Sequence, residues 1–341
     1  NKSMTPTLAT ALNCNETIDG GLQAIFKPVE NDFRAVNQLI PEQLTSDVPL
    51  IGEMGKYIVE SGGKRLRPLI VLLTSRACGY QAQQHIKLAT LVEFLHTATL
   101  LHDDVVDKST RRRGKTTANA IWGNAPSVLV GDFFYSRAFQ LMVDLDNMDL
   151  MAIISNATNL IAEGEVLQLA NVGNADLTET EYTKIITHKS ALLFQAAAHT
   201  AAILATDNTD TINHMKKYGL HFGLAFQLID DWLDYAGNSE LMGKNVGDDL
   251  SEGKATLPLI HTMKCGSSPD IQLVKAAIIN KSSEDLNNVI DAVRRSGALD
   301  YTKSRAIEEV QLALSELNIL PKNRYSEALE ALGHFAISRM Q

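Results

Sequence analysis

Two copies of an acidic pattern, Asp-Asp-x-x-Asp, carry the clearest chemistry in this sequence, at residues 103–107 and 230–234. Each copy ends an apolar run with helical periodicity. On an α-helix the first and last Asp of the pattern lie one turn apart on the same face. Mg²⁺ prefers oxygen ligands and usually keeps water and substrate phosphate in its remaining positions. The predicted Mg²⁺ ligands are therefore Asp103, Asp107, Asp230 and Asp234.

A single Asp-Asp-x-x-Asp pattern is weak support for a metal site, because a solvated acidic helix end has the same sequence. Here both copies follow apolar rather than charged segments, Leu95 to Leu101 and Leu224 to Ile229. The repetition favours a functional pair of motifs over two solvated helix ends.

Basic residues precede a predicted helix start in the segment Gly-Gly-Lys-Arg-Leu-Arg-Pro at 62–68. Lys64 and Arg67 are candidates for phosphate binding, since Arg forms bidentate pairs with phosphate oxygens and Lys supplies a point charge. The segment is not a P-loop, because the Ser/Thr after the Lys and a preceding strand are both missing. A solvated basic loop is the alternative.

Further cations and polar groups lie near each acidic motif: Arg111, Arg112 and Arg113 after the first, and His188, Lys189, Ser190, Gln227, Lys244 and Lys254 around the second. A lone lysine is usually solvated surface, but proximity to the motifs makes these residues candidates for anion binding. His96 lies about two turns before Asp103 on a similar face. A single histidine on an apolar helix is more often a packed core residue than a ligand.

The composition is that of an ordinary globular protein, with 45% hydrophobic and 21% charged residues. The net charge of −9 argues against general nucleic-acid binding, which needs a basic surface. No apolar run approaches the ~20 residues of a membrane span, and residues 1–21 lack the features of a signal peptide. Three widely spaced cysteines do not form a disulfide framework, and we expect a reducing cytoplasm, most simply the bacterial cytosol.

Helical periodicity and helix-forming residues extend through almost the whole chain, and no alternating strand pattern of useful length is present. Residues 1–28 are aperiodic and predict a flexible tail. Without a linker rich in Pro, Gly or Ser, residues 29–341 are expected to form one large all-α domain, a helical bundle around a central cavity. Residues 179–205 are expected to form one continuous helix.

Taken together, the motifs resemble those of the trans-isoprenyl diphosphate synthases, which extend an allylic diphosphate with isopentenyl diphosphate. The matching segments, in chain order, are 62–68, 101–107, 112–115, 131–133, 164–169, 226–234, 243–250 and 253–258. The resemblance covers roughly residues 30–341 and is greatest to the bacterial long-chain members that make quinone side chains. It implies two to three Mg²⁺ ions per site, a homodimer and a product of about eight isoprene units, made from farnesyl diphosphate.

The same resemblance implies roles for individual residues. Those expected to contact the diphosphate of the allylic substrate are Arg112, Lys189, Ser190, Gln227 and Lys244, with Lys254 a further substrate-binding candidate. Those expected to bind isopentenyl diphosphate are Lys64, Arg67, His96 and Arg113. Asp103 and Asp107 would hold Mg²⁺ against the allylic diphosphate, and Asp230 would hold another from the facing helix. Ser190 stands where family members commonly have Thr and keeps the hydroxyl.

Product length is expected to depend on the helix face that leads back from Asp103. Ala98 and Thr99 are small and leave room for a growing hydrocarbon, and Leu95 lies one turn further along. Met142, with Phe139 one turn earlier, is a candidate for the far end of the tunnel. Alternatively, Ala98 and Thr99 are small only so that helices pack closely.

Three other functions remain open: a shorter-chain (farnesyl or geranylgeranyl) synthase, a terpene cyclase and a non-catalytic subunit of a heteromeric synthase. Cyclases typically carry an Asn/Ser/Glu motif at the second site and have no use for Lys64 and Arg67. A non-catalytic subunit would be expected to lose motif carboxylates, whereas this chain keeps all six.

Overall fold

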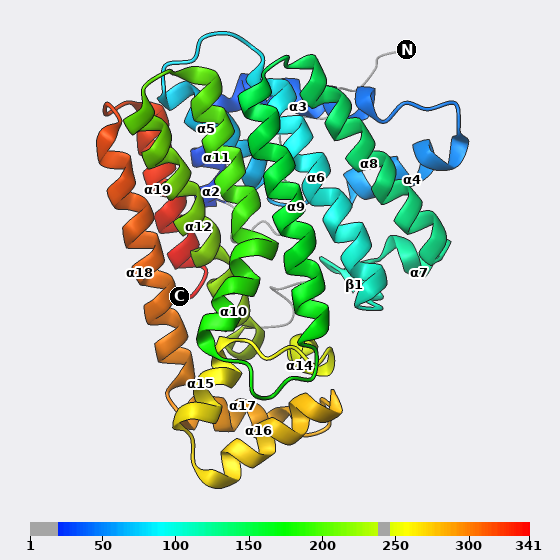
Figure 1. Ribbon diagram of the computed structural model, residues 1–341, viewed down its shortest axis with the longest axis vertical. Coiled ribbons are helices and arrows are strands. Elements are labelled where there is room, and N and C mark those ends of the chain that lie inside the picture. Colours follow the sequence, from blue (N-terminus) through cyan, green and yellow to red (C-terminus); the bar gives the residue numbers. More distant parts are fainter. Residues whose placement is uncertain (1–19, 238–245) are drawn as a thin grey trace. The chain divides into compact units, whose positions relative to one another are not determined.

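The computed structural model describes residues 20–237 and 246–341, and helices account for nearly all of their regular structure (Figure 1). The predicted all-α class is confirmed. The helices of the first half are α2 (Gly20–Phe26), α3 (Glu30–Gln43), α4 (Pro49–Glu60), α5 (Leu66–Ala77), α6 (His85–Val106), α7 (Ala118–Trp122), α8 (Asn124–Asp144) and α9 (Met148–Ala170).

The second half continues with α10 (Glu179–Ile186), α11 (Leu192–Ala205), α12 (Thr209–Ala236), α14 (Asp248–Ser251), α15 (Leu257–Cys265), α16 (Ser268–Asn280), α17 (Leu286–Arg295), α18 (Ala298–Glu316) and α19 (Arg324–Ser338). Short 3₁₀ turns lie at Lys27–Val29 (η1) and Leu317–Ile319 (η3). The element η2, at Thr187–Ala191, is a π-helical turn.

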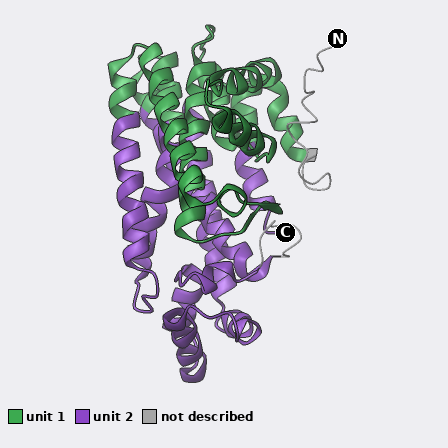
Figure 2. Cartoon of the chain, turned by 90° about the vertical axis from the view of Figure 1, so that its right-hand side faces the viewer, with its two compact units in different colours: residues 1–153, 197–212, 320–331 green, residues 154–196, 213–319, 332–341 purple. Residues whose placement is uncertain are grey.

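Contacts divide the chain into two compact units (Figure 2). Unit 1 comprises residues 1–153, 197–212 and 320–331, and unit 2 comprises residues 154–196, 213–319 and 332–341. The single domain predicted for residues 29–341 stays a prediction.

The core of unit 1 includes α3, α5, α6 and α8. α5 is buried on almost every side, which matches its near-continuous apolar sequence. α6 and α8 lie side by side (Figure 1), and Phe94 meets Phe134 edge to face with ring centroids 5.2 Å apart. This packing fixes the axis of the helix that carries the first acidic motif.

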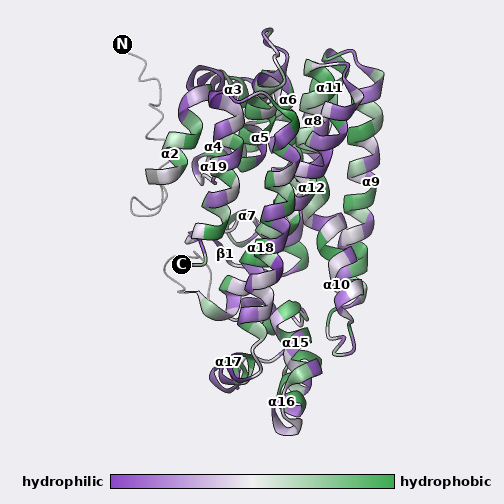
Figure 3. Cartoon of the chain, turned by 90° about the vertical axis from the view of Figure 1, so that its left-hand side faces the viewer, coloured by the Kyte–Doolittle hydropathy of each residue, from purple (hydrophilic) through white to green (hydrophobic). Residues whose placement is uncertain are grey.

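In unit 2, aromatic residues from α11 and α12 form a cluster: Phe194 lies 5.3 Å from Phe222 and 5.6 Å from Phe226, centroid to centroid. α9 buries Ile154, Ala157 and Ile161 at helical spacing, and Figure 3 shows both hydrophobic and hydrophilic residues along this helix. Such amphipathic patterning is what a helix packed on one side requires.

Two sequence predictions need correction. Residues 20–28 do not belong to a loose tail, because α2 and η1 bury Leu22, Ile25 and Phe26; residues 1–19 lie outside the described ranges. The segment 179–205 is not one helix, because η2 interrupts it. The segment that carries Arg111 to Arg113 after the first motif forms a short antiparallel hairpin, β1 (Arg111–Arg112) and β2 (Lys115–Thr116).

Along the described ranges, no helix combines the length and apolarity needed to cross a bilayer.

Candidate functional site

The first acidic motif ends α6, and its three aspartates differ in environment. Asp103 and Asp107 are half-buried, whereas Asp104 is only 5% exposed. Residues one apart on a helix point in directions about 100° apart. The outer two carboxylates therefore share one face, and the middle one faces the interior of unit 1.

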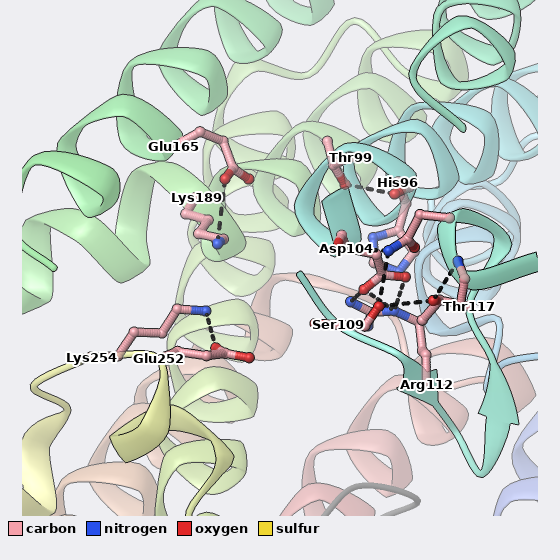
Figure 4. A network of polar contacts seen from close by, with 12 residues as sticks. His96, Thr99, Asp104, Ser109, Arg112, Thr117, Glu165, Lys189, Glu252 and Lys254 are labelled. Atoms are coloured by element: carbon pink, nitrogen blue, oxygen red, sulfur yellow. Dashed lines mark hydrogen bonds and ion pairs between the residues drawn. The ribbon is translucent and has the colours of Figure 1, made fainter. Parts of the chain in front are cut away.

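Asp104 forms a bidentate ion pair with Arg112 (Figure 4): Nη2 lies 2.7 Å from Oδ1, and Nε lies 3.0 Å from Oδ2. Burial lowers the pKa of Arg112, but Asp104, Asp103 and Asp107 together outweigh this and raise it. The guanidinium is thus a permanent cation within electrostatic reach of both predicted metal ligands, and the hairpin that carries it is tied to α6.

Arg113 joins the hairpin to the predicted phosphate-binding segment before α5. Its Nη1 donates to the carbonyl oxygen of Gly62. A Cβ on Gly63 would lie 2.6 Å from the same nitrogen, so a side chain at this position would displace the guanidinium. Lys64 follows directly and is exposed. Two motifs about 50 residues apart in sequence therefore place their cations in one region of unit 1.

His96 is on α6 and contacts Arg67 of this segment. Its Nε2 is 3.2 Å from Arg67 Nη1. Burial first, and then the charges of Arg67, Arg113, Arg112 and Arg65, hold the pKa of His96 well below its usual value. The imidazole is therefore neutral. Four guanidinium groups lie near it, of which Arg65 pairs with Glu93 and Arg112 with Asp104.

A pocket in unit 1 lies between α4, α6 and the hairpin, and Arg65, Glu93, Thr97, Asp104 and Arg112 are among its lining residues. Asp103, Asp107, Arg67 and His96 do not line it. It adjoins the inward face of α6, and two predicted substrate-binding residues, Arg112 and Arg113, line it. The pocket therefore includes part of the predicted diphosphate-binding cluster but not the predicted metal ligands.

The predicted chain-length residues are mostly buried in unit 1. Ala98 is 0% exposed, and Leu95 and Met142 are each 2% exposed. The hydroxyl of Thr99 donates to the carbonyl oxygen of His96, 2.6 Å away, so its polar group is satisfied within α6 (Figure 4). Phe139 is 37% exposed and therefore does not share the buried environment of Met142.

The second motif, on α12, repeats the arrangement of the first in one respect. Asp231, its middle carboxylate, is 4% exposed, while the side chain of Asp230 is 37% exposed. Asp234 differs from its counterpart Asp107, because it is fully buried. Asp230 is the carboxylate of this motif with the greatest access to a metal ion.

The Asp231 carboxylate accepts hydrogen bonds from the Tyr182 hydroxyl and from Gln227 Nε2, the latter at 2.9 Å. Burial, with the nearby charge of Asp249, raises the pKa of Asp231 to about 7. The buried carboxylate fixes the amide of Gln227, a predicted substrate-binding residue, one helical turn away.

The π-helical turn η2 carries Lys189 and Ser190. Lys189 Nζ donates to Gln168 Oε1 and lies 3.3 Å from Glu165 Oε2, both on α9 (Figure 4). These partners belong to residues 164–169, one of the segments that resemble the trans-isoprenyl diphosphate synthases. π turns insert one residue into a helix and frequently occur at functional sites.

Two glycines let neighbouring helices approach this turn. A Cβ on Gly164 would lie 2.8 Å from the backbone nitrogen of Lys189, and one on Gly223 would lie 2.8 Å from the Cα of Ala191. Helices α9 and α12 therefore contact the backbone of η2 directly, which fixes the position of Lys189.

Lys254 follows α14 and pairs with Glu252, with Nζ 2.8 Å from Oε2 (Figure 4). Lys244, predicted to contact the allylic diphosphate, lies outside the described residues.

Sequence reasoning missed four residues at these sites. Asp104 and Asp231 were within the motifs but received no role, although the helical period already turns the middle Asp away from its neighbours. Tyr182 and Arg339, which pairs with Asp230, carry no sequence signal, because their partners lie 49 and 109 residues away.

The accessible carboxylate oxygens of the two acidic motifs suit Mg²⁺ that also binds phosphate and water. In the described part of the chain no three His, Cys, Asp or Glu side chains converge on one metal position. Each motif instead offers accessible carboxylate oxygens beside fixed cations, which leaves positions for phosphate and water, the usual Mg²⁺ arrangement.

A family model described as Polyprenyl synthetase matches residues 48–295. The chain belongs to this family. It is 50% identical over 319 residues to octaprenyl diphosphate synthase of Escherichia coli, covering 93% of this chain and 99% of the relative. It is 48% identical to an all-trans-nonaprenyl-diphosphate synthase of Rhodobacter capsulatus, covering 94% and 98%.

Among solved structures, a polyprenyl synthase from Caulobacter crescentus, complexed with calcium and isoprenyl diphosphate, matches with a TM-score of 0.91 and 43% identity, covering 94% of this chain and 98% of that one. The relatives confirm the predicted function, a long-chain trans-polyprenyl diphosphate synthase, which is a prenyltransferase. They support the alternatives, a shorter-chain synthase or a terpene cyclase, less well.

The contact between Gly223 and η2 gives a testable prediction. Gly223→Ala places a Cβ against the backbone of Ala191 and should displace the turn that carries Lys189. We expect a lower melting temperature and at least a several-fold higher KM for the allylic diphosphate. Gly52→Ala is the matched control, because its Cβ meets nothing within 4 Å in a helix, and there Ala should be neutral or slightly stabilising. Equal behaviour of the two variants would contradict the role of Gly223.

Proposed function

We propose that this protein extends farnesyl diphosphate with isopentenyl diphosphate, in repeated Mg²⁺-dependent condensations, to octaprenyl diphosphate for quinone side chains. The observation that carries the proposal lies in unit 1. There Asp103 and Asp107 flank the ion pair between buried Asp104 and partly exposed Arg112, and Arg67 and Arg113 lie near His96. Carboxylates for a cation beside guanidinium groups for phosphate suit substrates that carry diphosphate.

The proposed residue roles follow the two clusters of unit 1 and the π turn of unit 2. Lys64, Arg67, His96 and Arg113 bind the diphosphate of isopentenyl diphosphate. Arg112, Lys189, Ser190 and Gln227 bind the allylic diphosphate, with Lys244 and Lys254 as further substrate contacts. Two observations support these roles. In unit 1, Arg67 and Arg113 both lie near His96. In unit 2, hydrogen bonds to Gln168 and Asp231 hold Lys189 and Gln227 in place.

Asp103, Asp107 and Asp230, with Asp234, would hold the Mg²⁺ ions, two to three in all. The bound ions would neutralise the charge that develops on diphosphate as its carbon–oxygen bond breaks. Arg112 in unit 1 and Lys189 in unit 2 each offer a positive charge for diphosphate, and their paired carboxylates keep them in place before the reaction. The allylic cation is attacked by the double bond of isopentenyl diphosphate, and a proton is then lost. The departing diphosphate is an adequate base, so no side-chain nucleophile is needed.

The metal ligands provide the main test. Asp103→Ala and Asp230→Ala should each lower kcat by at least about 100-fold, because each removes roughly 3 kcal/mol of transition-state stabilisation. Product is measured with radiolabelled isopentenyl diphosphate, farnesyl diphosphate and Mg²⁺. Both variants should fold, and Asp144→Ala, an exposed carboxylate of α8, should behave like the wild type. Full activity after EDTA treatment would show that the proposed metal dependence is wrong.

Product length needs its own test, since similar relatives are named for eight and for nine isoprene units. We propose that the hydrocarbon grows along the face of α6 with Ala98, Thr99 and Leu95, and that Met142 of α8 limits its length. Ala98→Tyr should shorten the product to about geranylgeranyl length with the first condensation largely intact, and Met142→Ala should lengthen it. Mass analysis of the products measures both.

Thr97→Tyr is the matched control, because Thr97 is next to Ala98 on α6 but lines a pocket that none of the proposed chain-length residues lines. It should leave product length unchanged. If Ala98 is small only for packing, Ala98→Tyr will instead destabilise the fold, by about 1–3 kcal/mol of overpacking, and leave the product at its wild-type length.

We also propose a homodimer that acts in the bacterial cytosol, where the free thiols of Cys78 and Cys265 persist. Val128, Leu129, Phe139 and Val143 of α8 are exposed and fall within an arc of about 100° on the helix. The exposed residues Asp132 and Ser136 lie in the same arc. The face is therefore mixed but rich in exposed apolar side chains, and such a face is typical of one that another protein surface covers.

Leu129→Glu with Val143→Glu should convert the dimer to a monomer in analytical ultracentrifugation, because each places a charge in the covered face. Val166→Glu, at an equally exposed apolar position of α9, is the control and should leave the mass unchanged. A dimer that survives the double substitution would show that this face is not the interface.

A further inference from the structure

A cation that the sequence analysis overlooked contacts the second acidic motif. Arg339 directly follows α19, and its Nη2 lies 2.8 Å from Asp230 Oδ1. Its guanidinium carbon lies 4.6 Å from the centre of the Phe226 ring, one turn before Asp230 on α12. The side chain is only 11% exposed. Within unit 2, a buried guanidinium is thus held between an aromatic face and the most accessible carboxylate of the motif.

The second terminal nitrogen of this guanidinium, Nη1, is buried and has no hydrogen-bond partner among the described residues. A buried donor without an acceptor costs free energy, and proteins rarely keep one without a reason. Because the guanidinium is planar and rigid, one N–H of Nη1 points to the same side as Nη2, so an acceptor on that side would lie next to the Asp230 carboxylate that Nη2 already binds. A phosphate oxygen matches this fork geometry.

The residue after Arg339 is anchored, and a neighbouring lysine links it to the second motif. Met340 is 4% exposed, and Lys303 Nζ on α18 donates to its carbonyl oxygen at 3.4 Å. The same Nζ lies 5.8 Å from the ring centre of Trp232, whose Nε1 donates to the Leu299 carbonyl oxygen at 3.0 Å. Trp232 is itself part of the second motif. The guanidinium is therefore fixed by packing around the motif and is not a mobile surface cation.

We propose that Arg339 is a diphosphate ligand of the second motif. Nη1 donates to an oxygen of substrate diphosphate or of released pyrophosphate, while Nη2 keeps the Asp230 carboxylate oriented toward the Mg²⁺ that this diphosphate carries. The inference rests on the proposed function, since it assumes that Asp230 holds Mg²⁺ for a diphosphate. It adds a contact that neither the motifs nor the comparisons indicate.

Isothermal titration of the full chain with inorganic pyrophosphate in the presence of Mg²⁺ tests the contact directly. Arg339→Met keeps an apolar side chain over Phe226 but removes both donors, and it should weaken pyrophosphate binding at least tenfold. Arg339→Lys keeps the charge without the fork and should give a smaller loss. Arg295→Met is the matched control, because Arg295 also pairs with a carboxylate of unit 2, Asp270, 2.8 Å away on α16, and its loss should leave binding unchanged.

Pyrophosphate binding by Arg339→Met that equals the wild type overturns the proposal. Tighter binding also overturns it, because it would mean that Arg339 competes with Mg²⁺ for Asp230. If Arg339→Met fails to fold in a thermal melt, Arg339→Lys decides, and unchanged binding by that variant is the overturning result. A wild-type chain that does not elongate farnesyl diphosphate defeats the proposed function, while the pyrophosphate titration still reports on Arg339 separately.

Discussion

A buried carboxylate cannot stay without partners, and this constraint organises both acidic motifs. Removing an ionised group from water costs several kcal/mol unless hydrogen bonds and opposite charge compensate. The helical period turns Asp104 and Asp231, the middle residue of each motif, toward the interior of its unit. Asp104 is compensated by Arg112, and Asp231 by Tyr182 and Gln227. The inward carboxylates therefore position the groups that the proposed reaction uses.

Close backbone approach is the second way in which groups are fixed. In unit 2, Gly164 and Gly223 bring α9 and α12 against the π turn at Thr187–Ala191, where any side chain would collide with the backbone. In unit 1, Gly63 leaves the space that the Arg113 guanidinium fills. These glycines matter because they lack a side chain, and the cations beside them are consequently held in place before substrate arrives. Preorganised charge of this kind is effective in stabilising a transition state, because it does not have to reorganise during the reaction.

Much of the fold could be predicted from local pattern. The all-α class is one example, because apolar periodicity and helix-forming residues are local properties of the chain. The interruption at Thr187–Ala191 could not be predicted, since it depends on helices that pack against it rather than on its own residues. The assignment of residues 20–28 to a tail was wrong for a related reason: Leu22, Ile25 and Phe26 are buried only through contacts with distant segments.

The sequence by itself determined the family, the acidic motifs and the outward direction of Asp103 and Asp107, because these follow from residue types at short spacing along a helix. Tertiary structure alone decided which cation meets which carboxylate. Asp230 and Arg339 are 109 residues apart, and Tyr182 and Asp231 are 49 apart. It also decided that Asp234 is buried and Asp230 accessible, although both occupy the same face of one helix. The physical reason is that solvent exposure and pairing depend on the neighbouring helices, whose positions no local spacing specifies.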